Sequence, residues 1–204
     1  MDEDDITPGP EAVPEPDEPE PDAPISPSSG PAALDEPPGP VNWNLLGAEE
    51  AEEAWLELNR WVDWLRHEFG LPAAVIPPYW HRHPELVWEL SALHIHWLCA
   101  YDPQQNGSAP IGWLRDFAES RQRLRDWVAA SGTRLDRDRP TRQTVWPGEE
   151  QAEPIEDAAI TDRDAGFVNF VVSDVARREQ AEEEYYARLD PETGELTRPT
   201  RRTV

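Results

Sequence analysis

Two pairs of histidines are the residues of this sequence whose spacing comes nearest to a metal site. They are His81-x-His83 and His94-x-His96, with Cys99 shortly after them. Residues two apart on a helix point about 200° away from each other, and His83 and His94 are separated by roughly 16 Å of helix axis. Metal ligands must all lie about 2 Å from one ion. We therefore predict no metal site, and expect His83 to cap a helix, His94 to pack in the core and His96 to face solvent.

Two carboxylates, Glu85 and Glu89, share a helix face in the way that acid–base catalysis requires. No nucleophile accompanies them by spacing. The sequence has no dinucleotide-binding glycine motif, Walker loop, Gly-x-Ser-x-Gly elbow or His-Glu-x-x-His motif. We interpret the pair as solvated surface, and predict a non-enzymatic protein with no catalytic residue and no cofactor.

Four arginines between residues 115 and 125 give one segment a basic character. Acidic residues are interleaved with them, so that Arg115–Glu119 and Glu119–Arg123 are expected as ion pairs one helical turn apart. A DNA-binding helix-turn-helix needs a turn of about three or four residues. The polar stretch 102–109 is longer than that, so we predict an ordinary charged surface here.

A short cationic segment occurs twice. Arg-Pro-Thr-Arg-Gln-Thr-Val at 139–145 recurs as Arg-Pro-Thr-Arg-Arg-Thr-Val at 198–204. On an acidic chain the two copies could bind an acidic partner bivalently, fold back on the acidic N-terminal segment, or be a duplication without function. The candidate partner-binding arginines are Arg139, Arg142, Arg198 and Arg201.

An amphipathic half-helix follows the first copy of this segment. Its apolar residues are Phe167, Phe170, Val171 and Val175, and the stretch 177–184 after them is almost wholly charged. Such a helix on a flexible tether could lie in the groove of a partner protein. It could equally dock on the protein's own helical domain, and the sequence leaves both possibilities open.

The elements that would position these groups are helices. Trp55, Leu58, Val62, Leu65 and Phe69 step by 3-4-3-4, which predicts a helix that ends at Gly70. A second helix is predicted from Pro84, and because it is apolar around most of its circumference we expect it to be buried on most sides. A third is predicted from Ser108 to Gly132.

Nine of the ten tryptophans lie between residues 43 and 127, which marks the apolar core. We interpret them as core residues of a small bundle rather than as a ligand pocket. Trp80 precedes the second helix and is the tryptophan that we expect to be exposed, so it is a further candidate partner-binding residue.

The predicted fold is all-α: a small three-helix, Trp-rich bundle with an additional C-terminal helix, flanked by disordered acidic and Pro-rich arms. Residues 1–40 contain twelve acidic residues and twelve prolines, too few apolar groups to offset the entropy of ordering. The predicted boundaries are 1–42 for a disordered arm, 43–132 for the bundle, 133–160 for a disordered linker, 161–189 for the last helix, opened by a Thr161–Asp164 capping box, and 190–204 for a disordered tail.

The formal net charge of −24 disfavours contact with nucleic-acid phosphates and anionic membranes. Neither a secretory leader nor an apolar run of about eighteen residues is present, which predicts a cytoplasmic protein without membrane contact. The single cysteine, Cys99, cannot form an intramolecular disulfide.

Residues 72–132 resemble an uncharacterised actinobacterial family, domain of unknown function 4913. The resemblance rests on Trp-His-Arg-His-Pro-Glu-Leu-Val-Trp-Glu-Leu at 80–90, followed by Leu93, Trp97, Trp113 and Asp116. It implies an accessory protein of plasmids, phages or other mobile elements, and it carries no reaction or functional residue.

The leading functional hypothesis is therefore a non-enzymatic adaptor with unknown protein partners. The alternative is a nucleic-acid-handling protein of a mobile element, acting by direct binding or by mimicry of the charge of DNA.

Overall fold

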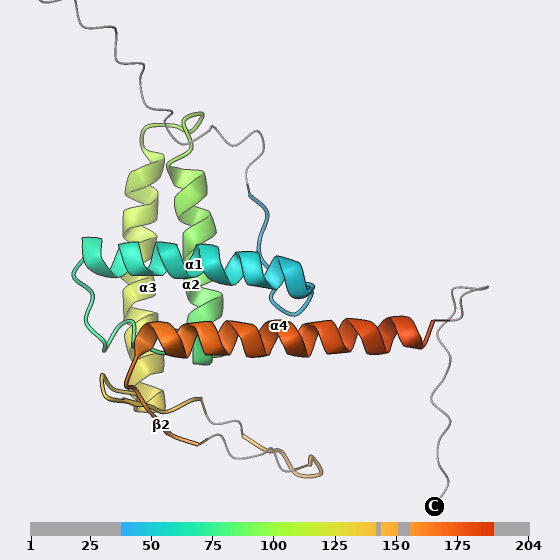
Figure 1. The fold of residues 1–204 in the computed structure, drawn as a ribbon. Coiled ribbons are helices and arrows are strands. Elements are labelled where there is room, and N and C mark those ends of the chain that lie inside the picture. Colours follow the sequence, from blue (N-terminus) through green and yellow to red (C-terminus); the bar gives the residue numbers. More distant parts are fainter. Residues whose placement is uncertain (1–37, 142–143, 151–155, 190–204) are drawn as a thin grey trace, which may run out of the picture. The chain divides into compact units, whose positions relative to one another are not determined.

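The computed structural model describes residues 38–141, 144–150 and 156–189, and within these ranges the fold is all-α, as predicted. The helices are α1 (Ala48–Glu68), α2 (Pro84–Ala100), α3 (Ala109–Ser131) and α4 (Arg163–Ala187), with a single 3-10 turn η1 (Trp80–Arg82). Two short strands, β1 (Arg137–Asp138) and β2 (Ala158–Ala159), pair in an antiparallel arrangement. Figure 1 shows α2 and α3 side by side, with α1 and α4 running across them.

The helix ends follow local sequence signals. Gly70 and Gly132 take positive φ values of 57° and 73° just after α1 and α3, a backbone region that side chains with a Cβ rarely adopt. Pro84 is the first residue of α2. The predicted cap of the last helix is wrong by one residue: Asp162, not Thr161, accepts two backbone N–H bonds of the first turn of α4.

The core confirms the Trp-rich cluster and corrects one of its members. The rings of Trp43 and Trp55 pack at a tilt of 37°, with centroids 4.1 Å apart, and Trp113 Nε1 donates to the carbonyl of Leu93 at 3.2 Å. The prediction that Trp80 is exposed is wrong, since only 1% of it is accessible. Because the chain turns back through η1 beneath α4, the ring of Trp80 is enclosed by other aromatic rings.

The outer face of α2 corrects a second prediction. The prediction that the second helix is buried on most sides fails along one stripe: Trp88 is 40% exposed, Ala92 is exposed, and Ile95 and Cys99 are half-buried. The reason is that α1 and α3 pack against only two sides of α2, so the third side stays uncovered by the described residues.

The amphipathic half-helix docks on the protein's own bundle. Phe167 and Val171 are buried, and Phe170 and Val175 pack against the same core. Phe167 and Phe170 lie over the ring of His81, at centroid distances of 5.3 and 4.9 Å. Of the two possibilities that the sequence left open, the structure therefore shows self-docking.

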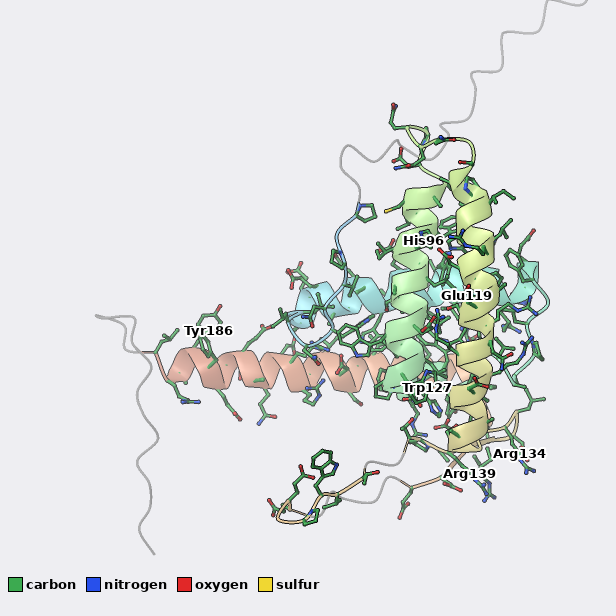
Figure 2. All side chains as sticks on the ribbon, turned by 180° about the vertical axis from the view of Figure 1, so that it is seen from behind. His96, Glu119, Trp127, Arg134, Arg139 and Tyr186 are labelled. Atoms are coloured by element: carbon green, nitrogen blue, oxygen red, sulfur yellow. The ribbon has the colours of Figure 1, made fainter. Side chains whose placement is uncertain are left out.

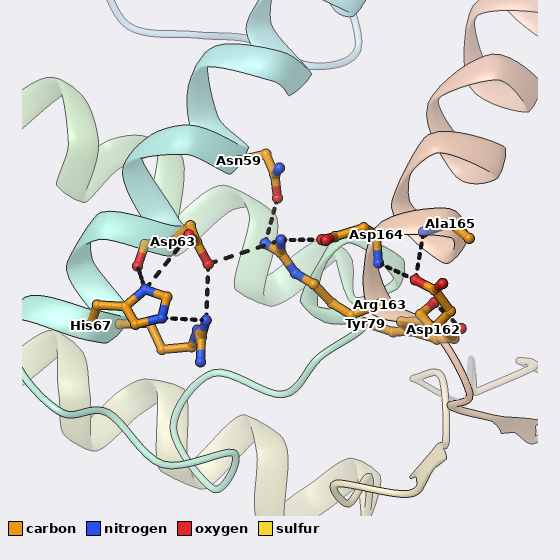
Figure 3. Close-up of polar contacts among 9 residues, drawn as sticks. Asn59, Asp63, His67, Tyr79, Asp162, Arg163, Asp164 and Ala165 are labelled. Atoms are coloured by element: carbon orange, nitrogen blue, oxygen red, sulfur yellow. Dashed lines mark hydrogen bonds and ion pairs between the residues drawn. The ribbon is translucent and has the colours of Figure 1, made fainter.

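Polar contacts fix the N-terminal end of α4 (Figure 3). Arg163 reaches across to α1, where its Nη2 donates to Asn59 Oδ1 at 2.7 Å. The hydroxyl of Tyr79 donates to the carbonyl of Asp162 at 3.1 Å. Gly166 allows the helix to approach this closely, since a Cβ there would lie 2.6 Å from the ring of Tyr79.

The charged half of α4 also contacts the bundle. Trp55 Nε1 donates to Asp174 Oδ2 at 3.1 Å, and Arg178 donates to the carbonyls of Leu46 at 2.7 Å and Trp43 at 3.1 Å. The residues that anchor α4 are thus spread over most of its length.

Within the described ranges, no helix is both long enough and apolar enough to cross a lipid bilayer.

Candidate partner-binding groove

The segment after α3 is not the disordered linker that the sequence predicted. Residues 133–141 and 156–160 are described, β1 pairs with β2 between them, and Thr133 and Asp138 are buried. The described parts of this segment show that a polar, proline-bearing stretch can be ordered by a few buried polar contacts, without an apolar stripe of its own.

Asp138 is the centre of those contacts. It is 0% exposed, and its Oδ1 lies 2.8 Å from His83 Nε2 and accepts from the hydroxyl of Thr133 at 3.1 Å. Its Oδ2 lies 2.8 Å from Arg82 Nη1. These four residues form the Asp138 clamp, which fastens the segment after α3 to the start of α2.

The clamp determines the charge state of His83. Burial disfavours its protonation, but hydrogen bonds and charges from Asp138 and Glu85 outweigh burial and hold the pKa of His83 above 6.5. Partial burial raises the pKa of Glu85, but its contact with His83 and the hydrogen bond that it accepts from the hydroxyl of Thr141 outweigh burial and hold the pKa below 4.5. The contacts with Asp138 and Glu85 therefore favour the protonated form of His83, which occupies the N-cap position of α2 but makes no side-chain hydrogen bond to that helix.

The segment held by the clamp forms one wall of a groove of about 470 Å³. Three arginines line it: Arg125 from α3, and Arg134 and Arg139 from the segment after α3. Apolar side chains fill the space between the guanidinium groups. They are Ala73, Ala74, Val128, Ala129 and Leu135.

A second hollow, of about 450 Å³, adjoins the groove, because Gly132 and Arg139 line both. Trp127, which is 46% exposed, and Pro140 give this hollow its aromatic and apolar walls. In Figure 2, Trp127, Arg134 and Arg139 lie near one another at the end of α3. We call the two hollows together the arginine groove.

Three arginines and one carboxylate, Glu85, line the arginine groove, so its charge favours an anionic ligand at the arginines. Arg139 Nε pairs with Asp157 at 3.0 Å, and Arg125 makes one long hydrogen bond to Gln122. Arg134 makes no side-chain ion pair among the residues that the structure describes. Guanidinium groups bind carboxylates and phosphates through paired N–H donors, and Trp127 offers an aromatic surface beside them.

The residues predicted as partner-binding fall into three groups. Arg139 lies in the arginine groove, whereas Trp80 and the apolar residues of α4 are taken up by the core or pack against it. Arg142, Arg198 and Arg201 lie outside the described residues. Arg125 and Arg134 were missed, because nothing in their local sequence shows that they converge with Arg139.

The other groups with chemical potential are engaged in ion pairs or buried. Glu89, predicted to be solvated, accepts from Ser120 and pairs with Arg123 at 2.7 Å. His96, predicted to face solvent, bonds to Asp116 at 3.1 Å. The two arginines predicted to pair with Glu119 have other partners: Arg115 pairs with Asp116, and Arg123 pairs with Glu89. Among the described residues, no three histidine, cysteine or acidic side chains are placed to share a metal ion.

The residues that the structure describes form a helical fold with a cationic groove near the end of α3. No family model, no curated protein and no solved structure matches the chain.

Proposed function

We propose that this protein is a non-enzymatic adaptor that binds an acidic segment of a partner protein in the arginine groove. The observation that carries the proposal is the convergence of Arg125, Arg134 and Arg139 on one hollow of a chain whose net charge is −24. Seven of the eighteen arginines lie between residues 115 and 139, so the cationic charge is concentrated at this end of α3.

The groove also favours a particular kind of acidic segment. Its apolar floor and the half-exposed ring of Trp127 suit a peptide that places a leucine or an aromatic residue between its carboxylates. Each exposed arginine–carboxylate pair contributes only about 0.2–1 kcal/mol, so the interaction is weak and sensitive to salt. The apolar contact supplies the remaining affinity.

The non-enzymatic part of the proposal is supported by how the acid–base groups are used. Glu85, Glu89 and His83 each have a fixed hydrogen-bonding or ionic partner in the fold. A general acid or base needs access to a substrate proton, and these three groups are held in structural contacts instead.

The biological setting that we propose is an accessory role in an actinobacterial plasmid, phage or other mobile element. Its support is the resemblance of residues 72–132 to domain of unknown function 4913. In the fold this stretch supplies η1, α2 and α3, and it carries two of the four residues of the Asp138 clamp, Arg82 and His83.

The second candidate function is nucleic-acid handling. The arginine groove would accept phosphates as readily as carboxylates. Charge mimicry is favoured by a different observation: Glu182 of α4 accepts from the backbone of Ala48 at 2.8 Å, which brings the glutamates of 182–184 beside those of 49–53 at the start of α1.

Fluorescence anisotropy distinguishes these functions. The probes are a labelled twelve-residue peptide of alternating glutamate and leucine and a labelled twelve-nucleotide oligothymidine, each titrated with the full chain at low salt. We expect the peptide to bind and Arg134→Glu to weaken it about tenfold. The matched control is Arg115→Glu, an exposed arginine on α3 outside the groove, which should change binding less than about twofold.

Two outcomes would contradict the adaptor proposal. One is equal loss of peptide binding in Arg134→Glu and Arg115→Glu, which would mean that only overall charge matters. The other is preferential binding of the oligonucleotide, which would favour the second candidate.

A further inference from the structure

The outer face of α2 is an apolar surface that the described residues cover only in part, since Trp88 and Ala92 are exposed while Ile95 and Cys99 are half-buried. Its members are Trp88, Ala92, Ile95 and Cys99, which we call the α2 seam. They are spaced by 4, 3 and 4 residues, the spacing through which two helices pair along their length. A half-exposed tryptophan at one end of such a seam is typical of a residue that another helix covers.

We propose that the α2 seam is the docking site for a second copy of this chain. The two α2 helices would lie antiparallel about a two-fold axis that passes between Ala92 and Ile95. This inference goes beyond the proposed function, because it uses a different surface from the arginine groove and no acidic partner.

The sizes of the side chains favour the antiparallel arrangement. The two-fold axis places Trp88 of one copy opposite Cys99 of the second copy, and Ala92 opposite Ile95. Both pairs set a larger side chain against a smaller one, which lets two helix surfaces interlock without a void. A parallel pairing would instead set Trp88 against Trp88 at one end and leave cysteines facing each other at the other.

The charges beside the seam are complementary under the same axis. On α3, Arg123 lies near one end, beside Glu89, and Asp116 lies near the other end, beside His96. Reversing the second copy brings Arg123 next to Asp116 of the second copy, and this happens twice in each dimer. Figure 2 shows this face of α2 and α3, with His96 and Glu119 marking it.

The acidic character of the chain does not prevent this pairing. α2 has only two acidic residues, Glu85 and Glu89, and both are engaged within the same chain. Charges elsewhere on the two copies are screened beyond about 8 Å at physiological ionic strength.

Thiol cross-linking tests the arrangement, because Cys99 is the single cysteine of the chain. The variants carry Cys99→Ser and one introduced cysteine. In the dimer, the two Ala92→Cys thiols, one from each chain, would be offset by about 4.5 Å along the helix axis, and the two Trp88→Cys thiols by roughly 16 Å. A short bis-maleimide matches the ~8–10 Å between packed helices. We expect at least about fivefold more covalent dimer from Ala92→Cys than from Trp88→Cys.

Equal cross-linking at both sites would indicate parallel pairing and overturn the proposal, as would no cross-linking at either. Light scattering gives an independent readout: at about 100 µM the wild-type chain should show twice the monomer mass of 23.2 kDa. Ala92→Glu should raise the dissociation constant at least about tenfold, while the matched control Ala118→Glu, on the opposite side of α3, should not. A wild-type chain that is monomeric at this concentration refutes the dimer and leaves the groove proposal unaffected.

Discussion

His81 provides the most direct test of how α4 is held. Its ring is buried between Tyr79, Trp80, Phe167 and Phe170, and neither ring nitrogen has a hydrogen-bond partner among the described residues. Burial lowers the pKa of His81 from 6.5 to about 3. The negative charge of Asp138 opposes this shift, and nearby arginines reinforce it. The folded protein therefore keeps this imidazole neutral under α4.

The sign of the pH dependence follows from proton binding. Between about pH 6.5 and about pH 3 the unfolded chain binds a proton at His81 and the folded chain does not, so this residue lowers the free energy of unfolding as the pH falls. At 1.36 kcal/mol per pH unit, the loss between about pH 7.5 and about pH 5 is roughly 2 kcal/mol. Because the side chain is almost fully buried, solvent screening does not reduce this figure appreciably.

The perturbation that isolates this contribution is His81→Phe. Urea unfolding, followed by tryptophan fluorescence at both pH values, gives the free energy of unfolding of the variant and the wild type. We expect the variant to gain roughly 2 kcal/mol on the wild type between about pH 7.5 and about pH 5, because the titrating ring is gone. His67→Phe, at a largely exposed position of α1, is the matched control.

If the variant gains less than about 0.5 kcal/mol on the wild type between these two pH values, this reasoning is refuted. It would mean that the imidazole is not enclosed by the aromatic rings of α4, and hence that the helix does not stay docked in solution.

Three further predictions concern the contacts that hold the second half of the chain. Gly166→Ala should lower the free energy of unfolding by about 1–3 kcal/mol, because the added Cβ would meet the ring of Tyr79. Gly112→Ala, where the added Cβ has open space, should be neutral or stabilising, and urea unfolding of both variants compares them. Asp138→Asn should cost about 3–5 kcal/mol and speed hydrogen exchange of the amides at 134–139, because it leaves Arg82 and His83 without their buried anion. The pKa of His83, measured by NMR, should lie above 6.5. The stabilisation from its ionic contact with Asp138 is complete below about pH 6.5 and is lost as the pH rises through the folded pKa, and Asp138→Asn should lower that pKa.

The sequence is informative about the helices because their signals are local. The 3-4-3 spacing of Trp55, Leu58, Val62 and Leu65 repeats every turn, and Gly70 and Gly132 mark helix ends through their own backbone preference. These features need no knowledge of distant contacts. The periodicity of α2 could not show which of its apolar faces would be covered, because that depends on where α1 and α3 lie.

The arginine groove could not be predicted from the sequence, because its residues come together only in the fold. Its shape depends on Asp138, which is 55 residues from His83 and belongs to a stretch rich in charge and proline. A buried carboxylate in such a stretch looks like any solvated one until its cationic partners are placed around it. The repeated Arg-Pro-Thr-Arg segment made Arg139 a candidate, but Arg125 and Arg134, which line the groove with it, come from α3 and from the turn before β1.

The charged half of α4 shows why a high charge density need not mean a solvated helix. Arg178 donates to the carbonyls of Trp43 and Leu46, which precede α1 and have no helical partner there. Glu182 accepts from the backbone of Ala48, one of the orphan donors in the first turn of α1. The two side chains thus complete the backbone hydrogen bonding of a segment more than 130 residues away. A helix that was solvated along this face would leave those groups to water, so the charges of α4 belong to the fold as much as its phenylalanines do.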